Sequence, residues 1–132
     1  MTFPGVSMRA VLVWACLFAS LLPVSALAWT RIGETAELTL YVNRNSIEKE
    51  NTIRRVWEMQ DLKTADADGV LSRRYINEYD CNYKMHRIGK MTSFAGPKMT
   101  GQRIANVDEM GYWRKIPPNG VFVLTYIAVC IE

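Results

Sequence analysis

The stretch RRYINEYDCNYKMH, residues 73–86, separates two kinds of side chain onto alternate positions. The apolar and aromatic set is Tyr75, Tyr79, Cys81, Tyr83 and Met85. The polar set is Arg74, Glu78, Asp80, Asn82, Lys84 and His86. Because successive side chains of a β-strand point to opposite faces, the alternation predicts one long strand with a solvated face.

Further strands are indicated on both sides of this stretch. Residues 37–42 alternate in the opposite phase, and residues 52–62 place Ile53, Trp57 and Met59 on one side. The connection 63–69 carries aspartates and ends in glycine, which is typical of a hairpin loop. Another strand is expected over 87–94, because Ala95-Gly96-Pro97 would end it. These segments predict an antiparallel sheet.

The last third of the chain is less regular. Residues 100–112 have no periodicity, so we interpret them as a surface loop. The run 121–131 is rich in Val, Ile and aromatic residues, which favours a strand. Its length and its start after Pro117-Pro118-Asn119-Gly120 also suit a buried helix. The residues alone leave both readings of 121–131 open.

The N-terminus has the order of a signal peptide. Arg9 is the only charged side chain before the apolar run 10–24, and Ser25-Ala26-Leu27-Ala28 follows. Small residues at 26 and 28 fit a signal peptidase, and the run is shorter than the roughly 20 residues of a membrane span. We therefore predict that residues 1–28 are cleaved and that no membrane span follows. Translation starting at Met8 would leave this destination unchanged.

The expected mature chain, residues 29–132, is long enough for one domain. Its 13 acidic and 15 basic residues leave a charge of about +2, too mild to indicate nucleic acid. It retains Cys81 and Cys130, which in an oxidising compartment predict a disulfide. Closing such a loop stabilises a fold by about 4 kcal/mol in the chain-entropy model.

No catalytic or metal-binding pattern occurs in the expected mature chain. It lacks G-x-S-x-G and S-x-x-K, and its single histidine, His86, falls on the predicted polar face as a solvated side chain. A zinc site needs more His or Cys ligands, and Asp66-Ala67-Asp68-Gly69 lacks the remainder of a calcium loop. We expect no enzyme, no metal and no cofactor.

The charged and aromatic side chains fit two interpretations, a solvated sheet face whose arginines are balanced by carboxylates, or a binding surface. We interpret Glu58 with Asp61, and Glu78 with Asp80, as members of surface ion pairs with nearby arginines. Basic doublets lie close to aromatic residues, a combination suited to an anionic or protein ligand. The residues assigned to this candidate ligand face are Arg54, Trp57, Arg73, Arg74, Trp113 and Arg114.

An ordered set of short motifs resembles the surface-adhesin E family. The motifs are Leu40-Tyr41-Val42, Ser46-Ile47, Arg55-Val56-Trp57-Glu58-Met59-Gln60-Asp61, Tyr79-Asp80-Cys81, Trp113-Arg114-Lys115-Ile116-Pro117-Pro118 and Cys130. The resemblance implies a small α+β domain with about six antiparallel strands. It also implies a C-terminal helix over 121–131, tied to the sheet by the Cys81–Cys130 bond.

The resemblance also implies a function. The namesake of the family is a dimeric surface lipoprotein that binds host proteins such as vitronectin and laminin. We therefore expect an exported domain that binds a host matrix or envelope protein, and a homodimer.

The signal differs from that of the namesake, because bulky Trp14 precedes Cys16 where a lipoprotein signal carries a small residue. The alternative is a soluble periplasmic protein of structural type, or an inhibitor that acts through residues 98–112. The location is periplasmic in that case and otherwise the cell surface or exterior.

Overall fold

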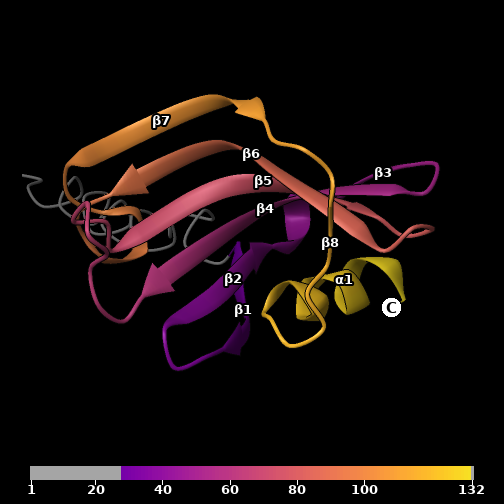
Figure 1. The fold of residues 1–132 in the computed structure, drawn as a ribbon, viewed down its shortest axis with the longest axis horizontal. Helices are drawn as coiled ribbons and strands as arrows, with labels where there is room; N and C mark the ends of the chain where they lie inside the picture. Colours follow the sequence, from indigo (N-terminus) through magenta and orange to yellow (C-terminus); the bar gives the residue numbers. More distant parts are fainter. Residues whose placement is uncertain (1–27, 132) are drawn as a thin grey trace, which may run out of the picture.

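The computed structural model describes residues 28–131, which form one antiparallel sheet and one α-helix (Figure 1). The predicted signal peptide lies outside the described residues except for Ala28. In the sheet, strands β1 (Trp29–Glu34), β2 (Leu38–Asn43), β4 (Ile53–Leu62), β5 (Ser72–Asp80), β6 (Met85–Phe94) and β7 (Arg103–Met110) follow in this order. Short β3 (Glu48–Glu50) pairs with β4, and β8 (Arg114–Lys115) pairs with β6. None of the helices in this part of the chain is long and apolar enough to cross a membrane.

The two faces of the sheet have different surroundings. Helix α1 (Phe122–Cys130) packs on one face, where Tyr126 and Val129 join Val42, Val56 and Tyr79 in a buried cluster. We call this the helix face. Burial of each such side chain contributes roughly 1.5–3 kcal/mol, so the cluster holds α1 against the sheet.

The C-terminal run is a helix, as the family resemblance implied. Its last residue, Cys130, is disulfide-bonded to Cys81, with the two Cα atoms 5.5 Å apart. The hydroxyl of Tyr126 donates a hydrogen bond to the carbonyl oxygen of Cys81 at 3.3 Å. The predicted disulfide is therefore confirmed, and it joins α1 to the turn between β5 and β6.

The prediction of one long strand over 73–86 is wrong. Strand β5 ends at Asp80, whose carboxylate accepts hydrogen bonds from the backbone N–H groups of Asn82 and Tyr83 at 2.9 and 3.0 Å. Lys84 has a φ of 55°, a turn conformation, and β6 then returns antiparallel to β5. In this register His86 lies opposite Tyr79, and so on the helix face.

The prediction of a loop over 100–112 is also wrong, because residues 103–110 form β7 at the edge of the sheet. Nearly every residue of β7 is exposed, so no alternation of apolar and polar side chains is needed there. The pairing with β6 is close around Gly89, where an added Cβ atom would lie 2.5 Å from the carbonyl oxygen of Glu109.

The expected architecture is partly correct. The domain has one sheet and one C-terminal helix, but the sheet contains eight strands instead of about six, and the fold is mostly β. The strands predicted over 37–42 and 52–62 match β2 and β4 closely. Strands β1, β3 and β8 were not predicted from the sequence.

Candidate functional site

The six residues of the candidate ligand face do not share one side of the sheet. Paired residues on neighbouring strands point to the same face. Arg54 pairs with Tyr79, Arg73 with Gln60, and Arg114 with His86. These pairings place Arg54, Arg73 and Arg114 on the helix face. Trp57 pairs with Ile76, and Arg74 with Met59, on the opposite face. Trp113, one residue before Arg114, belongs to the opposite face and lies beside Arg87.

Cations stack on aromatic rings across the face opposite α1. The guanidinium carbon of Arg74 lies 5.5 Å from the ring centroid of Trp57, and that of Arg87 lies 4.7 Å from Trp113. The ammonium group of Lys98 lies 5.8 Å from the ring of Tyr41. Each such pair is attracted by the negative face of the ring. We call these six residues the cation–aromatic row: Tyr41, Trp57, Arg74, Arg87, Lys98 and Trp113.

Glu78 fixes part of this row. One carboxylate oxygen lies 3.1 Å from Arg87 and the other 3.5 Å from Arg55, while only 5% of the side chain is exposed. Glu78 forms ion pairs with arginines as predicted, but it is nearly buried and not at the surface. An arginine held by a nearly buried carboxylate keeps its position on Trp113, so this end of the row is ordered before a ligand arrives.

Glu58 contradicts the prediction of a surface ion pair, because it is completely buried on the helix face. Its carboxylate accepts hydrogen bonds from the amide nitrogen of Asn77 at 2.8 Å and the hydroxyl of Tyr79 at 2.6 Å. Burial raises the pKa of Glu58, and these hydrogen bonds oppose the rise only in part. Asp61 instead accepts a hydrogen bond from the backbone N–H of Lys98 at 2.9 Å.

His86 also contradicts its prediction, since only 6% of it is exposed. Its Nδ1 lies 3.1 Å from the side-chain oxygen of Asn77, and its ring centroid lies 4.7 Å from that of Phe122. Burial, and secondarily the charge of Arg114, lower the pKa of His86. Asn77 thereby connects His86 to Glu58 in one buried polar network.

The buried polar network and the accessible side chains of the described residues differ in what they can contact. Glu58 is enclosed by protein, so its carboxylate does not reach a bound substrate. Across residues 28–131, no three His, Cys, Asp or Glu side chains are grouped as metal ligands. The accessible features are instead the cation–aromatic row and a pocket beside His86.

Three members of the row, Tyr41, Arg87 and Lys98, were not among the predicted ligand residues. Arg87 could have been placed with Glu78 by alternation along β6, had the turn after Asp80 been recognised. Lys98 reaches Tyr41 from the segment after β6, so no local pattern could have found it.

The domain is thus a disulfide-linked antiparallel sheet with a helix on one face and cation–aromatic pairs on the other. The chain belongs to the Surface-adhesin protein E family, whose model matches residues 29–131. A comparison with curated proteins finds no match.

Solved structures of Haemophilus influenzae protein E have a similar fold. Crystal form II has a TM-score of 0.60 at 12% identity, with 78% of this chain and 87% of that chain covered. The selenomethionine form has a TM-score of 0.61 at 12% identity and covers 80% and 87%. Protein E from non-typeable H. influenzae has a TM-score of 0.53 at 11% identity and covers 84% and 78%. At these identities the likeness concerns the fold alone.

Proposed function

We propose that this protein is an exported adhesin-like domain that binds a protein ligand, from the host matrix or the cell envelope, on its cation–aromatic row. The observation that carries the proposal is the row itself, with three cation–aromatic pairs on the face opposite α1. Trp, Tyr and Arg are the residue types that most often dominate protein interfaces. Family membership supports the same class of function.

The chemistry of the row favours a particular kind of ligand segment. Arg55, Arg74, Arg87 and Lys98 are basic, and Glu78 is already paired with two of them. The aromatic rings offer flat apolar area between these charges. We therefore expect a segment with acidic side chains beside aromatic or aliphatic ones, and an affinity that falls as salt rises.

The proposal is tested with the domain 29–132 on immobilised matrix and serum proteins, vitronectin and laminin among them. We expect saturable binding to at least one of them. Arg74→Glu removes the cation that lies on Trp57 and places a negative charge at position 74, so the variant should bind more weakly by about tenfold or more. Biolayer interferometry at several salt concentrations measures the affinities of the wild type and of the Arg74→Glu variant.

Arg73→Glu is the matched control, because Arg73 is the neighbouring residue of β5 and lies on the helix face. Its affinity should stay within about twofold of the wild type. Equal losses for both variants, or the absence of saturable binding across the panel, would contradict the proposal.

Location and oligomeric state remain proposals that separate experiments address. Protease digestion of the protein on intact cells would place the domain outside the cell and favour a host ligand. Protection until the outer membrane is opened would place it in the periplasm and favour an envelope ligand. A homodimer, proposed from the family resemblance, is measured by light scattering of the purified domain.

A further inference from the structure

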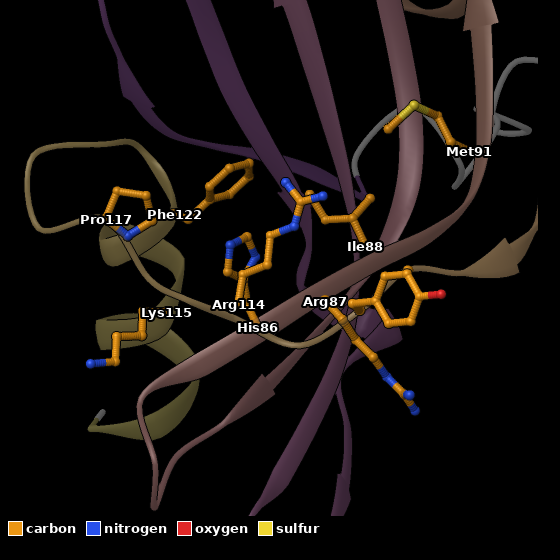
Figure 2. A pocket seen from close by; sticks show the side chains of 10 residues that line it. His86, Arg87, Ile88, Met91, Arg114, Lys115, Pro117 and Phe122 are labelled. Carbon is orange, nitrogen blue, oxygen red and sulfur yellow. The ribbon is translucent and has the colours of Figure 1, made fainter.

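A pocket of about 330 Å³ lies beside His86 on the helix face, and of the cation–aromatic row only Arg87 also lines it (Figure 2). Its walls come from β6, from the segment 111–117 and from the start of α1. Ile88, Met91, Pro117 and Phe122 supply apolar surface, and Figure 2 shows Ile88 of β6, Arg114 of β8 and Phe122 of α1 around the same space. The volume is at the lower end of the range for small-molecule sites.

The charge at this pocket is positive and unbalanced. Arg114 and Lys115 both line it and are exposed, and its lining contains no carboxylate. Neither residue forms an ion pair with any residue in the described part of the chain. A guanidinium group beside apolar walls favours an anionic head group, which it binds through paired hydrogen bonds.

His86 is held in one orientation at the pocket wall. The amide nitrogen of Asn77 donates to Glu58 and Tyr79, so its side-chain oxygen accepts the hydrogen bond from His86 Nδ1. In the neutral ring this leaves Nε2 as the nitrogen without a hydrogen bond to the described residues. The buried network therefore fixes the His86 ring at the pocket wall, where a ligand that enters the pocket changes the surroundings of that ring.

We propose that this pocket binds a small apolar monocarboxylate. Its head group lies at Arg114, with Lys115 adding positive charge nearby, and its apolar part lies against Ile88, Met91 and Phe122. This site goes beyond the proposed protein ligand, and apart from Arg87 it uses residues outside the cation–aromatic row. The aliphatic and aromatic forms of the ligand share this chemistry, and the test separates them.

The test uses the ring signals of His86, the single histidine of the chain, in NMR spectra of the untagged domain 29–132. Octanoate and 3-phenylpropanoate are the aliphatic and aromatic probes, and 1-octanol is the uncharged control. We expect a saturable shift of the His86 signals with at least one acid, and about tenfold weaker binding of the alcohol. The acid that binds more tightly shows whether the ligand is aliphatic or aromatic.

Arg114→Gln should weaken binding of the acid by about tenfold, and Lys115→Gln should weaken it to a smaller extent. Arg74→Glu, on the other face, should leave this binding unchanged, which separates the pocket from the protein-binding proposal. The inference is overturned if the shift does not saturate with either acid. It is also overturned if the wild type binds 1-octanol as tightly as the acid, or if the Arg114→Gln variant binds the acid as tightly as the wild type does.

Discussion

The carboxyl group of Glu58 is completely buried, and its partners are hydrogen-bond donors instead of cations. A buried carboxylate normally requires a cation, but Glu58 has two hydrogen-bond donors, Asn77 and Tyr79, and no ion pair with another described residue. Its negative charge also raises the pKa of Tyr79, whose burial is the larger cause of that rise. Because burial raises the pKa of Glu58, the folded protein holds the Glu58 proton more tightly than the unfolded chain does.

The sign of the pH dependence follows from this shift. Above the usual Glu pKa of 4.5 the unfolded chain releases the Glu58 proton while the folded protein still holds it. Stability from this group is therefore lost as pH rises from 4.5 to the raised pKa. The lowered pKa of His86 acts oppositely, since stability falls as pH drops below 6.5.

Glu58→Gln isolates the carboxylate, because His86 is present in both proteins. The glutamine accepts from Asn77, donates to the Tyr79 hydroxyl and carries no charge. The variant should gain stability over the wild type as pH rises above 4.5, by roughly 1–3 kcal/mol at the plateau. Urea unfolding at several pH values measures this gain, with exposed Glu109→Gln as the control. A gain that does not change with pH would contradict the account of Glu58.

At the scale of elements, the sequence predicted strands best where alternation is tied to burial. Residues 53–62 place Trp57 and Met59 on one side, as expected, because the other side packs beneath α1. The turn at 81–84 was missed because the alternation continues through it. Strand β7 was missed because it is exposed on both faces. Glu58 and His86 were misplaced since their type alone suggests solvent, whereas their partners come from other strands.

Helix α1 depends on its attachments more than on its own sequence. It has nine residues, and isolated helices of that length are marginal in water. The buried cluster and the Cys81–Cys130 bond therefore hold it on the sheet. Its apolar composition also explains why residues 121–131 looked equally suited to a strand.

Removing the disulfide measures its contribution. The double variant Cys81→Ser/Cys130→Ser should lose about 4 kcal/mol in free energy of unfolding, because the unfolded chain regains the entropy of a loop of about 50 residues. Urea unfolding under oxidising conditions gives this value, and the wild type with reductant should match the variant. A loss below about 1 kcal/mol would show that the buried cluster alone holds α1.

At the scale of the whole molecule, the sheet separates two kinds of surface. The helix face carries the buried polar network and the small basic pocket. The opposite face carries ordered cation–aromatic pairs suited to a protein ligand. Arg73 and Arg74 are adjacent in β5 and therefore point to opposite faces, so alternation along the sequence could already have separated them within the candidate ligand face.

The most direct test is hydroxyl-radical footprinting of the domain, alone and in complex with a matrix or envelope protein that the binding experiments identify. Side-chain oxidation of Trp57 and Trp113 should fall strongly in the complex, because the ligand covers the cation–aromatic row. Exposed Tyr83 and Ile131, which lie outside the row, should be oxidised at unchanged rates. Unchanged oxidation of Trp57 and Trp113, with protection around α1 instead, would contradict the central claim.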